Sequence, residues 1–523
     1  MRRVAAPHGI AERVAGVHRG ARRSRPREAL TAVNAESVDV LIAGGGIAGL
    51  ATSFELHRRG VSCVVVEQAP RAGGVILSEE IDGYTIDAGP DSLLVQKPQG
   101  IELCEQLGLG DRLVPTKPPR LAFIQRNGRL HALPANSVLG VPTRLGPFIK
   151  TGLFTWAGKL RMGAEWLVPP RRDPGDESIG AFMRRRFGAE AATYLAEPLL
   201  AGIHAGDVDR LSVRALFPRF VEAEREHGSL LRAFSRRPAA EHAGSVGEGP
   251  AKAGHYAQGP EEAGPSVLRG QGAFRSLPGG LSEMVRALVA ALPAGTVRLD
   301  AAVTRVMGHG GTGPFRVEAG AHAFAARAIA LSTPAYVTAQ LIGDRDAELA
   351  RLCGEIQYSS TATIALAFRR EALAHPLNGS GFVVPKVEGS GILAGSWLSS
   401  KWPQRAPDGR VLLRTFVGGA RDRAALERSD AELVTLSLAA LTPLLGITGE
   451  PLLTRVYRFE RASAQHEVGH LARIEAIDRA LARHPGLFVT GSGFRGVGIP
   501  DCIADGRATA RKISQWLQEH AAR

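Results

Sequence analysis

Three glycines near the start of the chain have the spacing of a nucleotide-binding turn. Gly44, Gly46 and Gly49 follow the pattern G-x-G-x-x-G. In such a turn the first glycine permits a tight bend, the second lets the main chain approach a diphosphate, and the third lets a helix pack close to a strand. Main-chain N–H groups and the positive end of the helix dipole then hold the diphosphate. We therefore predict that a dinucleotide cofactor is bound by Gly44, Gly45, Gly46, Ile47, Ala48 and Gly49.

The elements that must position these glycines lie directly on either side of them. Residues 38–43 form a short apolar run that is typical of a buried parallel strand. The helix that follows is expected to end at Gly60, and a second strand over 61–66 leads into Glu67. Glu67 comes about 20 residues after the glycines, where a carboxylate can accept hydrogen bonds from a ribose diol. A purely structural glycine turn is the alternative, but the complete strand–helix–strand unit favours dinucleotide binding.

The composition is that of an ordinary globular protein. Of the 523 residues, 44% are hydrophobic and 22% are charged, which suits two or three domains with sizeable cores. No apolar run reaches the roughly 18 residues of a membrane-spanning helix, so any membrane contact is expected to be peripheral.

The net charge is +13, and eight arginines lie in the first 36 residues. Three alternatives fit that segment: an Arg-rich targeting segment, a disordered arm, or a misassigned start. We favour a disordered or misassigned extension. A nucleic-acid partner is not expected, because no aromatic residues are interleaved with the cations.

The four cysteines are scattered and include no C-x-x-C pair. They are Cys63, Cys104, Cys353 and Cys502. This spacing argues against a metal site and against a disulfide framework, and it fits a reducing cytoplasm.

A second group of glycines follows soon after Glu67. Gly73 and Gly74 come after Arg71, and Gly89 and Pro90 stand between two aspartates. Two surface turns would explain them, but a main chain that passes close to a large planar cofactor would explain them together. With the first turn, the pattern resembles the flavin-dependent amine oxidase superfamily, which implies FAD rather than NAD. The resemblance adds Gln68, Arg71, Gly74, Gly89, Pro90 and Asp91 to the cofactor site, with Glu67 on the adenosine ribose.

The middle of the chain is similar to the porphyrinogen oxidases of haem synthesis. The most specific stretch is 197–207, EPLLAGIHAGD, in which Gly202 would let the main chain lie against a flat macrocycle. Arg120 precedes a predicted hairpin with an Asn-Gly turn and matches an arginine that binds a propionate, which its planar fork suits. Phe382 matches an aromatic residue that stacks on the tetrapyrrole. The structural alternatives are a solvated surface residue for Arg120 and a core residue for Phe382. His204 has the chemistry of a base, but the alternative is a structural histidine.

The same resemblance places three later segments at the cofactor. Val303 would contact the adenine side of FAD through its main chain, and Trp402 would lie near the cofactor. Val497, Gly498 and Ile499 begin a helix whose N-terminus would face the flavin pyrimidine. The chain departs from the family pattern at 464–466, where Ala-Gln-His replaces Pro-Gln-Tyr.

Residues 137–170 combine apolar side chains with cations and almost no acids. We hold two alternatives for them: a face that rests on an anionic membrane, and a helical part that buries its apolar residues in its own core. Residues 236–268 are rich in Ala, Gly, Glu and Pro and are expected to form a low-complexity loop without a catalytic role.

We therefore predict an α/β protein with a discontinuous Rossmann-type FAD-binding domain, an α+β substrate-binding domain and a helical, membrane-facing part. The predicted segments are 1–36 (extension), 37–110, 271–335 and 461–523 (FAD domain), and 111–270 and 336–460 (substrate domain).

The resemblance implies six-electron oxidation of a porphyrinogen, with FAD accepting hydride and dioxygen accepting the electrons to give peroxide. Protoporphyrinogen IX is the first expectation. Coproporphyrinogen III, or another amine-oxidase-type reaction, is the alternative. No catalytic base is assigned and no metal is expected. A cytoplasmic protein is expected, with contact to the inner face of the cell membrane and a homodimer as further expectations.

Overall fold

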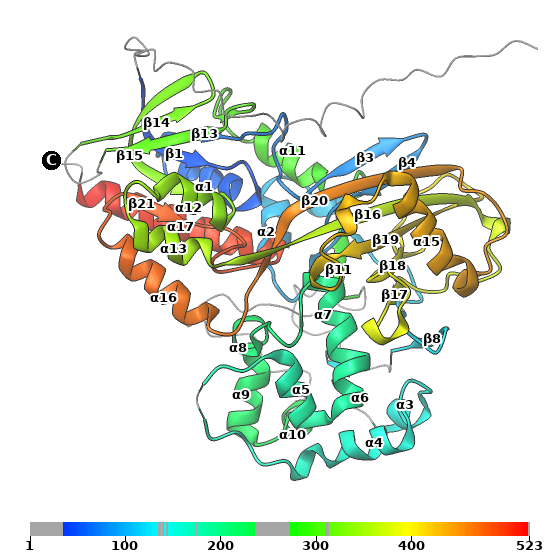
Figure 1. Cartoon of the computed structure of the whole chain (residues 1–523). Helices are drawn as coiled ribbons and strands as arrows, with labels where there is room; N and C mark the ends of the chain where they lie inside the picture. The colour runs from blue at the N-terminus through cyan, green and yellow to red at the C-terminus, as the bar shows by residue number, and fades with distance from the viewer. Residues whose placement is uncertain are drawn as a thin grey trace, which may run out of the picture.

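The structure is a computed structural model, and it describes residues 35–133, 137–138, 141–142, 145–173, 175–235, 272–308 and 313–520. Figure 1 shows one sheet with its helices at the left, a second sheet at the right and a group of helices below. Most of the predicted extension over 1–36 and the whole insert 236–268 lie outside the described residues.

The first sheet has seven strands and carries the glycine turn. Five strands run parallel, and the last two along the sheet, β14 and β13, run antiparallel. The strands come from three separate stretches of chain, as expected of a discontinuous cofactor domain, while the domain boundaries themselves stay predictions. The order is β12 (Val297–Arg298), β2 (Cys63–Val66), β1 (Glu36–Ala43), β15 (His322–Leu331), β14 (Phe315–Ala319) and β13 (Val303–Met307), with β21 (Leu487–Val489) beside β15.

Helices cover both faces of this sheet, which is why β2 and the second half of β1, from Val40 to Ala43, are continuous apolar runs. On one face Val40 and Ile42 pack against α17 (Ile499–Glu519), beside α1 (Ile47–Arg58). On the other face Leu41 and Ala43 pack in the cluster of α12 (Ala335–Ile342), α13 (Ala347–Gly354) and α16 (His470–Leu481). Each fully buried aliphatic side chain stabilises this arrangement by about 1.5–3 kcal/mol.

The second sheet is mostly antiparallel and has α15 (Asp430–Leu445) packed on one face. It contains the predicted hairpin, which is confirmed: β7 and β8 are joined by Asn127 and Gly128 at φ 50° and 67°, the left-handed values of a two-residue hairpin turn. The order is β20 (Leu453–Gln465), β16 (Gln357–Arg369), β19 (Arg410–Gly418), β18 (Ala394–Trp397), β17 (Gly381–Val383), β7 (Ala122–Arg126) and β8 (Arg129–Ala132).

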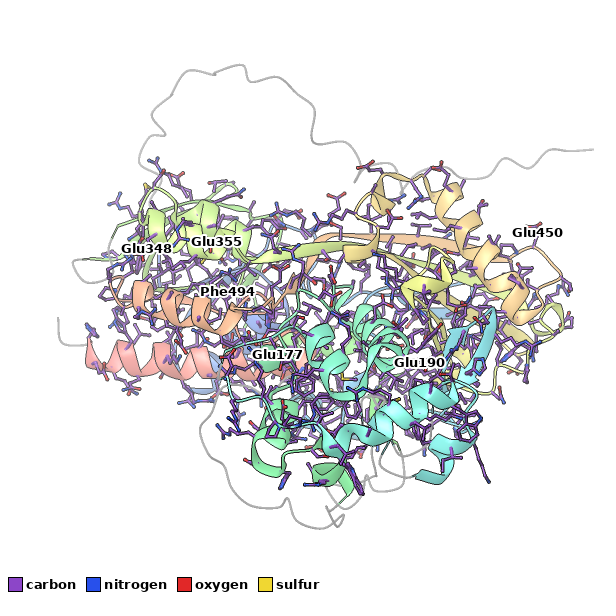
Figure 2. The ribbon with its side chains drawn as sticks, turned by 60° about the horizontal axis from the view of Figure 1, so that its bottom comes forward. Glu177, Glu190, Glu348, Glu355, Glu450 and Phe494 are labelled. Atoms are coloured by element: carbon purple, nitrogen blue, oxygen red, sulfur yellow. The ribbon has the colours of Figure 1, made fainter. Side chains whose placement is uncertain are left out.

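The helical part has a core of its own, with Phe182, Phe187, Leu195 and Phe220 among its buried residues. Figure 2 brings this part forward, with Glu177 and Glu190 labelled in it. Glu190 joins it to the second sheet through Arg126, at 2.6 Å. Its helices are α3 (Leu145–Lys150), α4 (Trp156–Gly163), η3 (Ala164–Leu167), α5 (Ile179–Phe187), α6 (Ala189–Ala191), η4 (Ala192–Ala196), α7 (Glu197–His204), α8 (Val213–Leu216), α9 (Pro218–His227) and α10 (Leu230–Ser235).

The remaining elements are short. They are β3 (Ser78–Ile81), β4 (Tyr84–Asp87), β5 (Leu93–Leu94), α2 (Gln99–Gln106), η2 (Gly110–Arg112), β6 (Val114–Pro115), β9 (Ser137–Val138), β10 (Val141–Pro142), β11 (Phe274–Ser276), α11 (Ser282–Ala290), η6 (Arg370–Ala372), η7 (Lys386–Glu388), α14 (Leu398–Lys401), η8 (Gly419–Arg421) and η9 (Ala425–Glu427). Within the described ranges, no helix is long and apolar enough to cross a membrane.

Candidate functional site

The glycine turn joins β1 to α1, and two of its glycines are required by packing. A Cβ on Gly44, which has φ +108°, would lie 2.6 Å from the Ser332 carbonyl oxygen. A Cβ on Gly49 would lie 2.1 Å from the Gly44 oxygen. Beside Gly46, in contrast, a Cβ would meet nothing within 4 Å. The turn is therefore packed tightly against the sheet on one side and leaves open space on the other.

That space adjoins the N-terminus of α1. Gly46 is the N-cap, and no side chain caps the helix. Uncapped N–H groups at a helix N-terminus bind phosphate well. The predicted Gly73-Gly74 turn lies against it, because the Gly73 N–H donates to the Gly45 oxygen at 2.8 Å and Gly46 pairs with Gly73. The first and second glycine groups therefore form one surface, which includes Ile47 and Ala48 at the helix start.

Glu67 lies at the end of β2, beside the same turn. Its carboxylate accepts the Gly45 N–H at 2.7 Å and the Ala69 N–H at 2.9 Å, next to Gln68. A carboxylate has further lone pairs with which it can accept a ribose diol. The Glu67 carbonyl accepts the Ala301 N–H at 2.8 Å, which brings the segment that leads to Val303 beside it.

Arg71 holds the second glycine turn in shape. Its guanidinium donates to the carbonyl oxygen of Gly74 at 2.6 Å and to that of Ile76 at 3.1 Å. Burial lowers the pKa of Arg71, partly offset by Glu67. A Cβ on Gly89 would lie 1.9 Å from the Val75 oxygen, so the Gly89-Pro90 loop has room only for glycine at position 89.

Asp91 and Trp402 belong to a buried polar cluster. Each oxygen of the Asp91 carboxylate accepts a hydrogen bond from Lys401 at 3.0 Å. One of these oxygens also accepts the Trp402 indole N–H at 3.4 Å and lies 3.4 Å from Arg414. Burial alone would raise the pKa of Asp91, but Lys401 and Arg414 hold that pKa well below its ordinary value. The polar atoms of Asp91 and Trp402 are thus bonded to other protein groups. These two residues can therefore support a cofactor only by holding the Gly89-Pro90 loop in position.

The C-terminal segment meets the glycine turn through a close helix crossing. A Cβ on Gly506 of α17 would lie 2.4 Å from the Ala48 oxygen of α1. Gly498 is the N-cap of α17, again without a side-chain cap, between Val497 and Ile499. Two uncapped helix N-termini are thus fixed relative to each other by this crossing.

Asp501 in the first turn of α17 forms a shielded ion pair with Lys97, at 2.6 Å. Burial lowers the pKa of Lys97 and raises that of Asp501, and their mutual attraction opposes both shifts.

The three predicted substrate residues lie in different parts of the structure. Arg120 is half-buried, donates to the Thr116 oxygen at 3.2 Å and lies against Gly272. Burial lowers the pKa of Arg275, and the positive charge of Arg120 lowers it further. Gly202 lies in α7, whose last residue, His204, reaches the second sheet. All three roles stay predictions.

The pleat of the second sheet places Phe382 and Phe416 on opposite faces. Phe382 is buried in the cluster under α15. In β19 the Thr415 hydroxyl contacts Ser437 of α15 at 2.7 Å, so its neighbours Arg414 and Phe416 lie on the other face. Arg414 donates to the Gly89 oxygen at 2.7 Å, which shows that this face lies toward the Gly89-Pro90 loop.

Phe416, to which sequence reasoning gave no site role, is a half-buried aromatic residue on the face toward Gly89, while the role of Phe382 stays a prediction. The period-two alternation of apolar residues in β19 is a signal that could have found it. Phe416 lies in a row across the sheet with Thr363, Ala394, Val383 and Ile124.

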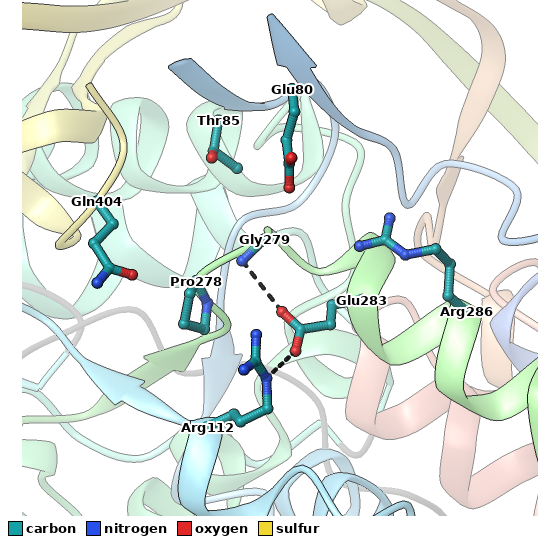
Figure 3. A pocket seen from close by; sticks show the side chains of 8 residues that line it. All are labelled: Glu80, Thr85, Arg112, Pro278, Gly279, Glu283, Arg286 and Gln404. Carbon is teal, nitrogen blue, oxygen red and sulfur yellow. Dashed lines mark hydrogen bonds and ion pairs between the residues drawn. The ribbon is translucent and has the colours of Figure 1, made fainter. Parts of the chain in front are cut away.

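A surface hollow of about 510 Å³ lies away from these residues (Figure 3). Glu283 in its wall is paired with Arg112 and accepts the Gly279 N–H at 3.2 Å. Glu80 and Arg286 add one charge of each sign. None of the predicted site residues lines this hollow, and we assign it no role.

Together the fold and site define an α/β dinucleotide-binding protein of the flavoprotein type. The open side of the glycine turn, the two uncapped helices and Glu67 fit the diphosphate, ribose and ring of FAD.

Comparison with known proteins agrees with this class. The model of the family described as flavin-containing amine oxidoreductase matches residues 47–514. The chain is 34% identical to coproporphyrinogen III oxidase of Bacillus subtilis, covering 91% of this chain and 98% of that protein. It is 28% identical to the chloroplastic protoporphyrinogen oxidase of Oryza sativa, covering 93% and 90%. A crystal structure of a putative protoporphyrinogen oxidase from Exiguobacterium superposes with a TM-score of 0.78 at 30% identity, covering 92% and 99%. The chain belongs to the flavin-containing amine oxidoreductase family, and FAD is its cofactor.

Glu67→Gln should weaken FAD binding by roughly tenfold to a hundredfold, because hydrogen bonds to a charged group contribute about 1.5–3 kcal/mol. The FAD dissociation constant, measured by flavin fluorescence, checks this. Glu55→Gln is the matched control, since Glu55 lies on α1 and is paired with Arg59 at 2.8 Å. Equal FAD affinity in both variants would contradict the role of Glu67.

Proposed function

We propose that this protein oxidises coproporphyrinogen III to coproporphyrin III in haem synthesis. The observation that carries the proposal is the identity of 34% and 32% to two coproporphyrinogen III oxidases over more than nine-tenths of the chain, against 28% for the protoporphyrinogen oxidase. The comparisons thus favour the alternative substrate over protoporphyrinogen IX, the first expectation.

The residues of the chain would act by binding and orienting the macrocycle. Phe416, half-buried on the face toward Gly89, would offer an aromatic surface, and Arg120 beside Arg275 would offer positive charge for a propionate. Coproporphyrinogen III carries two propionates where protoporphyrinogen IX carries vinyl groups, so rim charge would separate the two substrates. Bound FAD would supply the two-electron oxidising chemistry, with dioxygen as the final acceptor.

Purified holoenzyme should form porphyrin from both porphyrinogens, faster from coproporphyrinogen III. Each substrate is prepared anaerobically, air is admitted, and porphyrin fluorescence is followed against a sample without enzyme. Faster oxidation of protoporphyrinogen IX would overturn the substrate assignment, and no enzymatic porphyrin from either would overturn the proposed function.

Arg120→Ala should raise KM for the porphyrinogen by roughly tenfold to a hundredfold, the loss expected for a charge-assisted bidentate contact of about 1.5–3 kcal/mol. FAD content should stay at the wild-type value. Arg129→Ala, at an exposed position of the adjacent β8, is the control that should leave KM unchanged. An unchanged KM and kcat in Arg120→Ala would remove its assigned role.

We also propose that the helical part rests on an anionic membrane. Trp156, Leu160, Trp166 and Leu167 are exposed on α4 and η3, with Leu160 73% and Leu167 84% exposed. Lys159 lies 4.6 Å from the Trp156 ring centre. The one acid of residues 145–170, Glu165, is fully buried and paired with Arg186. The exposed face is therefore apolar and cationic, although the same helices also bury a core. The homodimer and the cytoplasmic location stay predictions.

The double variant Trp156→Ser/Leu160→Ser should reduce binding to vesicles of phosphatidylglycerol and phosphatidylcholine at least about tenfold, because each side chain contributes about 1.5–3 kcal/mol when buried. Co-sedimentation measures the bound fraction. Val387→Ser is the control, since Val387 is also exposed but lies on η7 of the substrate domain. No wild-type binding to these vesicles would remove the membrane proposal.

A further inference from the structure

A shielded ion pair near the predicted flavin site has no part in the proposed function. The Lys97 ammonium donates to both oxygens of the Asp501 carboxylate, at 2.7 and 2.6 Å. The side chains are only 14% and 7% exposed, so solvent and salt screen the two charges poorly. A shielded pair of this kind adds little net stability. What the pair contributes is therefore the effect of its charges on neighbouring groups.

The pair joins two segments that are predicted to contact the cofactor. Lys97 lies in the segment that follows the Gly89-Pro90 loop. Asp501 lies in the first turn of α17, whose N-cap is Gly498. Burial raises the pKa of Asp501, while the charge of Lys97 and a hydrogen bond from the Gly498 N–H oppose that rise. The ion pair thus fixes the start of α17 against the segment after the loop.

The start of α17 lies within reach of the glycine turn. Ile499 shares a buried cluster with Ile47 and Ala48 at the start of α1. Farther along α17, a Cβ on Gly506 would lie 2.4 Å from the Ala48 oxygen. A helix rises about 1.5 Å per residue, so Gly498 lies about 12 Å along the axis from this crossing. From a diphosphate at the N-terminus of α1, the ribityl chain of FAD can carry the flavin ring over a distance of this order.

The two helix N-termini at this site differ in charge. The first turn of α1 contains no acid, and the diphosphate predicted there is an anion in every state of the cofactor. The first turn of α17 contains Asp501, and Lys97 supplies the matching cation. An acid in the first turn counteracts the positive end of the helix dipole. Because Lys97 offsets the charge of this acid, the positive end of α17 stays available to a ligand.

This difference fits a ligand whose charge changes during turnover. The ring system of oxidised flavin is uncharged, and the uptake of a hydride turns it into an anion with its charge on the pyrimidine. A positive helix end stabilises that anion. An unpaired Asp501 carboxylate would repel the anion, and an unpaired Lys97 ammonium would attract it.

We propose that the ion pair of Lys97 and Asp501 tunes the reduction potential of the bound FAD, with Lys97 neutralising the acid at the start of α17. Both are positioning residues, because they act through charge and through the helix rather than by contact with the flavin. The inference rests on FAD, the cofactor of the family, and on the predicted position of the α17 N-terminus. It does not depend on which porphyrinogen is oxidised.

The charged and titratable groups around the pair decide how a variant responds to pH. Arg219 of α9 is a second cation that acts on Lys97, whose pKa is lowered mainly by burial. Burial raises the pKa of Cys502, so this neighbouring thiol stays uncharged. Burial lowers the pKa of His204, on which Lys97 also acts, to about 3, so this ring stays neutral. In a variant, a lone Asp501 is therefore charged mainly at higher pH and a lone Lys97 mainly at lower pH.

The test is the midpoint potential of the holoenzyme, measured anaerobically against a redox dye without substrate. Lys97→Met should lower the potential by a roughly tenfold shift of the reduction equilibrium, or about 30 mV for a two-electron couple. This difference from wild type should grow as the pH rises, because the lone carboxylate then loses any proton that it has taken up. Asp501→Asn should raise the potential, and this difference should shrink as the pH rises, because the lone ammonium loses its proton.

Three further variants separate charge from structure. The double variant Lys97→Met/Asp501→Asn and the charge-conserving Lys97→Arg should both keep the wild-type potential. Glu190→Gln is the matched control, because Glu190 forms a similarly shielded pair with Arg126 at 2.6 Å, in the helical part, and its loss should leave the potential unchanged.

Unchanged potentials in both single variants, or shifts in the same direction, would overturn the proposal. FAD affinity, measured by fluorescence, should stay at the wild-type value in every variant, since the oxidised ring is uncharged. Loss of FAD binding in both Lys97→Arg and the double variant would show a structural role and would also overturn the proposal. A protein that forms no porphyrin would end the proposed function but not this inference, because the potential is measured without a porphyrinogen.

Discussion

Two buried carboxylates join the cofactor-binding loop to the second sheet, and the geometry of the site depends on them. Asp87 is paired with Arg405 at 2.9 Å, with both side chains fully buried, and Asp91 is bonded to Lys401 and lies near Arg414. Buried ion pairs of this kind add little net stability, but an unpaired member is strongly destabilising. These ion pairs therefore act mainly by holding the loop in a single position. In this position Gly89 lies beside the sheet face that carries Phe416.

Much of the cofactor half could be predicted from the sequence because its chemistry is local. The strand, turn and helix around Gly44 to Gly49 are contiguous, and the steric requirement for glycine at Gly44 and Gly49 agrees with the spacing of the motif. Glu67 follows by the length of one helix and one strand. The Asn127-Gly128 hairpin was predictable for the same reason, since a two-residue turn requires left-handed residues at known positions.

The substrate half could not be predicted in the same way because its contacts join distant segments. Nothing local shows that Asp91 and Trp402 would bond to each other, or that Arg275 would lie near Arg120. Which face of its strand Phe382 or Phe416 occupies follows only when the packing of α15 is known. Likewise, the unsatisfied ring of His204 is visible only once every neighbouring partner has been placed.

The buried histidines of this region are poorly suited to act as general bases. A general base works best when its pKa lies near the working pH. Burial lowers the pKa of His204 to about 3, of His466 to about 4 and of His470 to about 2, so these rings stay uncharged at neutral pH and are weak bases. Arginine cannot act as a base, because it stays protonated. Position and charge are then what these residues contribute, and the oxidising power must come from the flavin.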